Sequence, residues 1–148
     1  MNLTMVVCAA VAAFGGTLAA ADSEADVARQ LLALERQAMD GWMKGSPDPD
    51  LARTDATVVY IHPAADKRLE GLPALTELFE KYRGRALFDS YDLVDPKVQV
   101  SGDVAILTFI LEYRMGSTVY RYDASEVYQH KKEGWRVIHA HWSKARTQ

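Results

Sequence analysis

Two histidines, His139 and His141, stand between two tryptophans in the segment GWRVIHAHWSK near the C-terminus. Side chains two apart on a strand could converge on one metal ion, with His62, His130 or Glu126 as a further ligand. One imidazole could instead be a general base, because its ordinary pKa of about 6.5 suits proton transfer near neutral pH. In a third interpretation both rings only make hydrogen bonds within the sheet or an interface. No spacing in the chain demands further metal ligands, so we favour the third interpretation and predict no metal site.

A single carboxylate, Glu126, is the other side chain that could do chemistry. In an extended segment it shares a face with Tyr128. If that face points inward, desolvation raises the pKa of the carboxyl unless a partner offsets it, which suits a general acid or base with a Tyr or His partner. The competing interpretation is an ion pair with Arg114, Arg121 or Arg136 on adjacent strands. The sequence shows no Gly-rich phosphate loop and no convincing Ser-His-Asp order.

The first 21 residues carry no charged side chain and contain an apolar run followed by Ala19–Ala21. This pattern predicts a signal peptide over residues 1–21, and therefore an exported protein, periplasmic or secreted. The apolar run is broken by Gly15–Gly16 and is too short for a permanent membrane anchor. Cys8, the only cysteine, lies in this leader, so the mature chain 22–148 has no thiol chemistry. The net charge of −3 argues against binding of nucleic acid or an anionic membrane.

Helical periodicity comes first in the mature chain and strand periodicity follows. A helix is predicted from the N-cap Ser23 to Gly45, with a further turn after Asp48. Its largely apolar face holds Ala28, Leu31, Leu32, Glu35, Ala38, Met39 and Trp42. A strand at 56–63 and a second helix between Gly71 and Gly84 come next. Four strands joined by short turns are then predicted at 86–102, 103–116, 117–134 and 135–145, with a bend or bulge at Pro96. This order indicates one α+β domain over residues 22–148.

The element order and the ending EGWRVIHAHWS resemble the nuclear transport factor 2-like superfamily, also called SnoaL-like or cystatin-like. Within it, the chain is similar to a bacterial group of unknown function related to the association domain of calcium/calmodulin-dependent protein kinase II. The residues that carry the resemblance are Gly134, Trp135, Val137, His139, His141, Ser143, His62-Pro63 and Leu69-Glu70-Gly71. The resemblance implies a cone: a strongly curved antiparallel sheet wrapped around two or three helices, enclosing a pocket and often dimerising through its outer face.

The resemblance also implies where pocket residues lie. The kinase association domain has pocket arginines at positions that correspond to Glu126, to Trp142 and to the vicinity of Phe109. None of these is basic here, which favours a neutral or cationic, partly apolar ligand over a carboxylate. The expected pocket residues are Tyr60, His62, Phe109, Tyr113, Glu126, Tyr128, His139 and Trp142.

The superfamily contains isomerases, dehydratases, hydrolases, binding proteins and assembly domains, so the fold does not choose among them. We predict an exported, cofactor-free domain that binds a small, partly apolar molecule and forms a homodimer through its sheet. The first alternative is an isomerase, dehydratase or hydrolase that uses Glu126 as general acid or base. The second is an assembly module whose pocket is filled by its own side chains.

Overall fold

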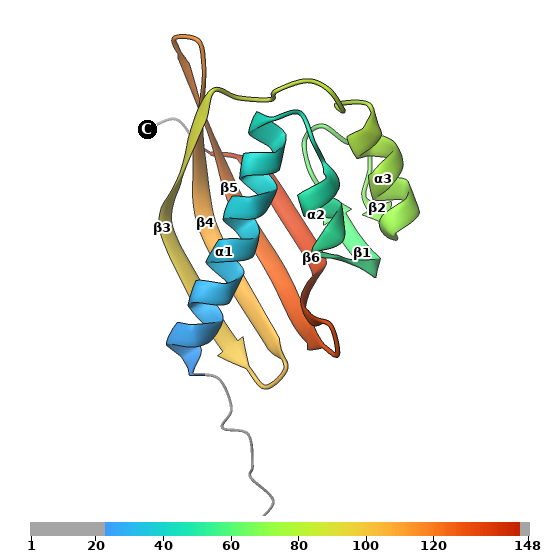
Figure 1. Ribbon diagram of the computed structural model, residues 1–148, viewed down its shortest axis with the longest axis vertical. Coiled ribbons are helices and arrows are strands. Elements are labelled where there is room, and N and C mark those ends of the chain that lie inside the picture. Colours follow the sequence, from blue (N-terminus) through green and yellow to red (C-terminus); the bar gives the residue numbers. More distant parts are fainter. Residues whose placement is uncertain (1–22, 146–148) are drawn as a thin grey trace, which may run out of the picture.

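The computed structural model describes residues 23–145, which form one curved six-stranded sheet with three helices (Figure 1). The predicted leader, residues 1–21, lies outside the described residues. In chain order the elements are α1 (Glu24–Met43), α2 (Asp48–Ala52), β1 (Thr54–Ile61), β2 (Leu69–Glu70), α3 (Leu72–Glu80), β3 (Ser90–Ser101), β4 (Val104–Met115), β5 (Thr118–Lys131) and β6 (Gly134–Lys144). Helix α1 crosses the inner face of the long strands (Figure 1). Within residues 23–145 no helix is long and apolar enough to cross a membrane.

Helix α1 begins at the predicted cap. The Ser23 hydroxyl accepts a hydrogen bond from the Asp26 backbone N–H, and the Asp26 carboxylate accepts one from the Ser23 backbone N–H, which makes a reciprocal capping box. Residues at spacings of three and four then face the sheet and are buried: Val27, Leu31, Glu35, Ala38 and Trp42. Four of these five are apolar, so burial of this stripe holds the helix on the sheet. The fifth, Glu35, belongs to the candidate site.

The sheet confirms the predicted α+β cone but is mixed rather than wholly antiparallel. Strands β3 to β6 form the predicted antiparallel meander. Strand β1 pairs antiparallel with β2 and parallel with β6, giving the order β2-β1-β6-β5-β4-β3. No hairpin joins β1 to β6, since they are the first and last strands within residues 23–145, and so nothing constrains this pair to be antiparallel.

A bulge in β3 confirms the bend predicted at Pro96. Val94 pairs with Ile110 and Lys97 pairs with Thr108, so β3 holds one residue more than β4 between the two pairs. Asp95, before the proline, has φ +48°, a conformation that few residues other than glycine adopt. Proline has no N–H for the ladder, and an irregular strand position accommodates that loss.

A second bulge, in β6, changes which side chains face inward. Val127 of β5 pairs with His139, and the next residue, Tyr128, pairs with Val137, which leaves Ile138 without a partner across the strands. A bulge reverses the alternation of side chains that an unbroken strand would keep. An unbroken strand from residue 135 to residue 143 would instead place Trp135, Val137 and His139 on one face.

The β6 bulge separates two pairs of residues that both point to the inner face of the sheet. Trp135 and Val137 are buried on the inner face before it, and Ala140 and Trp142 are buried on the inner face after it. His139 and His141 fall on the outer face, the first half-buried and the second exposed.

Candidate functional site

The inner face of the sheet, α1 and α3 enclose a cavity of about 530 Å³. Its walls are mainly apolar and aromatic, and include Trp42, Val58, Leu75, Phe79, Leu111 and Trp142. Phe79 of α3 packs edge-on against both Trp42 of α1 and Tyr60 of β1, with ring centroids 4.9 and 5.7 Å apart. A cavity of this size with such walls is typical of small-molecule sites.

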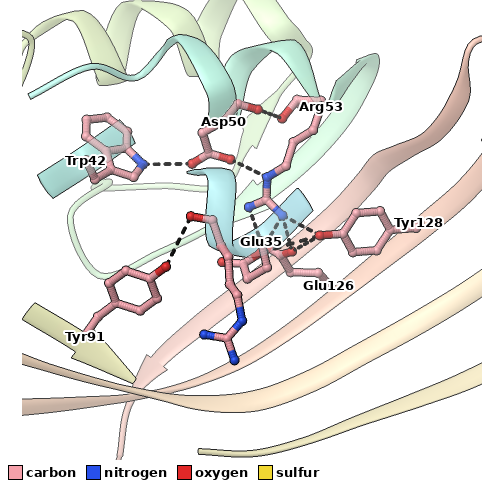
Figure 2. A network of polar contacts seen from close by, with 9 residues as sticks. Glu35, Trp42, Asp50, Arg53, Tyr91, Glu126 and Tyr128 are labelled. Carbon is pink, nitrogen blue, oxygen red and sulfur yellow. Dashed lines mark hydrogen bonds and ion pairs between the residues drawn. The ribbon is translucent and has the colours of Figure 1, made fainter. Parts of the chain in front are cut away.

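Arg53 lies at the base of the cavity, between α2 and β1, and is only 3% exposed. Its two terminal nitrogens hold the Glu126 carboxylate in a fork, at 2.9 and 3.1 Å. Its Nε donates to Asp50 Oδ1 at 2.9 Å, and the guanidinium also donates to Glu35 and to the Tyr128 hydroxyl. Figure 2 shows these groups converging on the one guanidinium. We call Glu35, Asp50, Arg53, Glu126 and Tyr128 the basal cluster.

Elements from both ends of the chain position the basal cluster. The backbone N–H of Val137, beside the β6 bulge, donates to the Arg53 carbonyl at 2.9 Å. The Trp42 indole N–H donates to Asp50 Oδ2 at 3.0 Å, and the Thr54 hydroxyl donates to the Asp50 carbonyl at 2.8 Å. The bulge therefore does two things: it turns Ala140 into the cavity wall, and it anchors the backbone that carries the buried arginine.

Three carboxyl groups share one cation, and this imbalance sets their charges. Burial raises the pKa of Glu35 well above its ordinary value, because desolvation and the neighbouring Glu126 outweigh the attraction of Arg53. Burial acts on Glu126 in the same sense. At Glu126, however, the attraction of Arg53 and hydrogen bonds with Glu35 and Tyr128 outweigh burial, so the pKa of Glu126 is lowered. Burial thus moves the pKa of Glu35 upward while Arg53 moves that of Glu126 downward, so that Glu126 is the stronger acid of the two.

This pairing bears on both interpretations of Glu126 made from sequence, and it corrects the second. The pKa of Glu126 is lowered rather than raised, since a partner offsets its desolvation. That partner is Arg53 and not Arg114, Arg121 or Arg136, because Glu126 points inward and is 1% exposed. Arg121 instead pairs with Glu112 and remains 61% exposed.

Five nearly parallel rings form a ladder, and four of them line the cavity. Tyr60, His62, Tyr122, Tyr113 and Tyr120 follow one another with centroids 5.7, 5.7, 6.0 and 5.1 Å apart and interplanar angles below 20°. The ladder crosses from β1 to the β4–β5 hairpin, which projects beyond the sheet at the top of Figure 1. Flat π-faces stacked in this way give this side of the cavity an aromatic wall.

His62 is the polar member of this ring ladder. Its Nδ1 accepts a hydrogen bond from the Ala64 backbone N–H at 2.9 Å, which places the ring proton on Nε2. Burial lowers the pKa of His62 to about 4, despite the nearby charge of Asp50. The ring is therefore neutral near pH 7 and can donate one hydrogen bond from Nε2.

The structure brings most of the sequence-predicted residues to one cavity. The cavity-lining ones are Tyr60, His62, Tyr113, Glu126 and Trp142. Phe109 lies behind the wall, edge-on to Trp142 at 5.5 Å, and Tyr128 lies behind Glu126, donating to it at 2.7 Å. His139 is on the outer face, away from the cavity.

Sequence reasoning did not identify Glu35, Asp50 or Arg53 as site residues. Glu35 could have been found, because a carboxylate on the stripe of α1 that is otherwise apolar requires a buried partner. Arg53 follows a short polar turn and has no comparable signal. Within residues 23–145 no group of three or more His, Cys, Asp or Glu side chains is arranged to hold a metal ion.

Comparisons with known proteins agree with this geometry. The family model for the SnoaL-like domain matches residues 36–147. A proposed ketosteroid isomerase from Parabacteroides distasonis is 26% identical, with a TM-score of 0.73 over 81% of this chain and 89% of that one. The CaMKII hub of S. rosetta is also 26% identical, with a TM-score of 0.64 over 79% and 95% of the two chains. An NTF2-like protein of unknown function from Pseudomonas putida is 20% identical, with a TM-score of 0.72 over 82% and 89%. A sequence comparison with curated proteins finds no significant match.

Proposed function

The chain belongs to the SnoaL-like domain family, and we propose that it is an exported domain whose cavity binds a small, partly apolar molecule. The observation that carries the proposal is the cavity itself, about 530 Å³ with mainly apolar walls and one polar cluster at its base. Small-molecule sites combine these features: apolar walls supply affinity, and a few fixed polar groups supply orientation.

The cavity also bears on the assembly alternative, which expected a pocket filled by the protein's own side chains. An apolar space of this size loses packing contacts that a well-filled core would make. A ligand that occupies it regains them. The open cavity therefore supports binding over a role in assembly alone.

Nile red, a neutral apolar dye, is expected to bind the purified chain with an increase in fluorescence. Ala140→Trp should weaken dye binding at least tenfold, or by about 1.4 kcal/mol, because the indole would project into the cavity. His141→Trp places the same side chain on the outer face and is the matched control. A dye titration on each variant, after a circular dichroism check of folding, measures the difference. Equal affinity of the two variants for the dye would show that the dye does not bind in the cavity.

An isomerase that uses Glu126 is the second candidate. Glu126 is an ionised carboxylate on the cavity wall, and a proposed ketosteroid isomerase is among the similar structures. An ionised carboxylate beside an apolar cavity can act as the base that moves a proton next to a carbonyl. Its fork with Arg53 opposes this role, because the ion pair stabilises the carboxylate and weakens it as a base.

A Δ5-3-ketosteroid is the substrate that distinguishes the two candidates. An isomerase would convert it to the conjugated ketone, followed by ultraviolet absorbance. Glu126→Gln would then reduce turnover by a factor on the order of 10² or more while leaving steroid binding detectable. We expect binding of the steroid without turnover, as for a simple binding domain. Turnover that survives in the Gln variant would exclude Glu126 as the base.

Export and dimer formation complete the proposal. A charge-free apolar leader over residues 1–21 supports export. The outer sheet face supports self-association, since it presents Ile106, which is 36% exposed, beside Val127. The hub of S. rosetta shares the fold that would carry such an interface. Mass spectrometry of the chain from an exporting host, under denaturing and then native conditions, tests leader removal and subunit number.

A further inference from the structure

The charges at the base of the cavity do not balance. Asp50 and Glu126 are the carboxylates on its wall, and Arg53 is the one cation at its base. Most of the guanidinium is already engaged: Nε with Asp50, one terminal nitrogen with Glu35, Glu126 and Tyr128, and the other with Glu126. Two carboxylates against one guanidinium leave one negative charge in a largely desolvated site, where an uncompensated charge is costly.

Asp50 has the acceptor capacity to hold a further donor. Each of its carboxylate oxygens receives one N–H, from the Arg53 side chain at 2.9 Å and from the Trp42 indole at 3.0 Å. An ionised carboxylate has about four acceptor positions, so roughly two remain. The side chain is 13% exposed, and it lines the cavity. The free positions are therefore open to a bound molecule.

Aromatic rings stand close to this carboxylate, and Trp42 presents its N–H edge to it. The Trp42 indole N–H donates a hydrogen bond to Asp50. The Trp42 ring contacts Phe79, and Phe79 contacts Tyr60. A cation close to such rings is attracted by their π-faces, and the attraction grows when water is excluded. A carboxylate next to clustered aromatic rings is a combination that recognises an ammonium group attached to an apolar body.

Other basic groups on the cavity wall do not reverse this preference. In the part of the chain that the structure describes, Arg85 is the only other Lys or Arg that lines the cavity. It is exposed and lies over the Tyr82 ring at 5.2 Å. The remaining basic side chain on the wall, His62, is a neutral ring near pH 7.

We propose that the cavity selects an organic monocation, an amine with an aromatic or aliphatic body, whose ammonium group lies against Asp50 beside the ring of Trp42. This inference rests on the proposed binding function and deepens it. The cation supplies the charge that the basal cluster lacks, while the apolar body occupies the ring-lined space. A carboxylate ligand is disfavoured, because it would add a further negative charge to the site.

Three probes of nearly equal shape test the charge preference: phenethylammonium, 2-phenylethanol and 3-phenylpropanoate. Each is titrated against the whole mature chain by displacement of Nile red. Phenethylammonium is expected to bind at least tenfold more tightly than the alcohol, a difference of about 1.4 kcal/mol, with the carboxylate weakest. In Asp50→Asn the preference for the ammonium over the alcohol should fall to within about twofold. Asp48→Asn, on the same helix but exposed and paired with Arg83, should keep the full preference.

Each outcome separates this inference from the proposed function. Displacement of Nile red by the alcohol or the carboxylate at concentrations as low as those of the ammonium overturns the cation inference and leaves the binding function in place. Displacement by none of the three, with Nile red still bound, also overturns it. Failure of Nile red itself to bind removes the proposed function and the inference with it. If Asp50→Asn does not fold, the ranking of the three probes on the unaltered chain decides alone.

Discussion

Arg53→Met is expected to lower the free energy of unfolding by roughly 3–5 kcal/mol at pH 7. The substitution removes the only cation of the basal cluster and leaves the buried carboxylate of Glu126 without its partner. Methionine has a similar length, so the change in charge dominates the change in volume. Glu126 must then take up a proton to stay buried, and the loss should therefore shrink as the pH falls. Urea unfolding at several pH values measures both effects.

Arg121→Met is the matched control, because Arg121 is also an arginine in an ion pair, with Glu112 on the neighbouring strand β4, but it is 61% exposed. It should cost about 1 kcal/mol or less. Adding Glu35→Gln and Glu126→Gln to Arg53→Met should recover part of the loss, since Asp50, which is 13% exposed, is then the one charged side chain left in the basal cluster. A cost for Arg53→Met no larger than that of Arg121→Met would contradict the buried ion network.

The elements of this fold are largely predictable from sequence, because local rules determine them. The capping residue Ser23, the turn of helix after Asp48 and the bend at Pro96 all occur where the pattern places them. The period of two after Gly84 also predicts the meander of four strands. Each of these features depends on residues within a few positions of one another, and single-sequence patterns carry that information.

The inward face of β6 is not predictable in the same way. Ile138 is an ordinary β-branched strand residue, and nothing in WRVIHAHW marks it as the bulged position. The bulge depends on partners far away in sequence: Val127 and Tyr128 across the ladder, and the Arg53 carbonyl that accepts from Val137. A shift of one residue moves every later side chain to the other face. His139 therefore lies on the outer face and Trp142 on the inner face, the reverse of what an unbroken strand would give.

The basal cluster shows the same limit for charged residues. Glu126 could be identified from its strand pattern, but its partner could not, because Arg53 lies 73 residues earlier in the chain. An expectation that considered only neighbouring strands therefore proposed the wrong arginines. Glu35 on the buried stripe of α1 was the local sign that a buried cation exists somewhere. Glu35 and Glu126 together imply a buried positive charge, and only the tertiary structure shows which residue supplies it.

Glu35→Gln is expected to make the protein progressively more stable than the unaltered chain as the pH rises. Burial raises the pKa of Glu35 well above the ordinary value of 4.5, with Glu126 adding to the shift. A carboxyl group with a raised folded-state pKa contributes stability that is complete below the unfolded-state value. That contribution is lost as the pH rises through the folded-state value. Glutamine stays neutral throughout, keeps a similar shape and can still hydrogen-bond to Arg53 and Glu126.

Between about pH 5 and pH 9, the stability difference should therefore move toward Glu35→Gln by on the order of 1 kcal/mol or more, since each unit of pKa shift corresponds to about 1.4 kcal/mol. Urea unfolding across this range gives the difference directly. Glu112→Gln, which removes a carboxyl that pairs with the exposed Arg121 on the outer face, controls for the loss of one negative charge. Parallel pH profiles for the unaltered chain and Glu35→Gln would mean that Glu35 stays ionised in the folded protein. The basal cluster would then carry two negative charges in excess rather than one, and the cavity would demand a cation still more strongly.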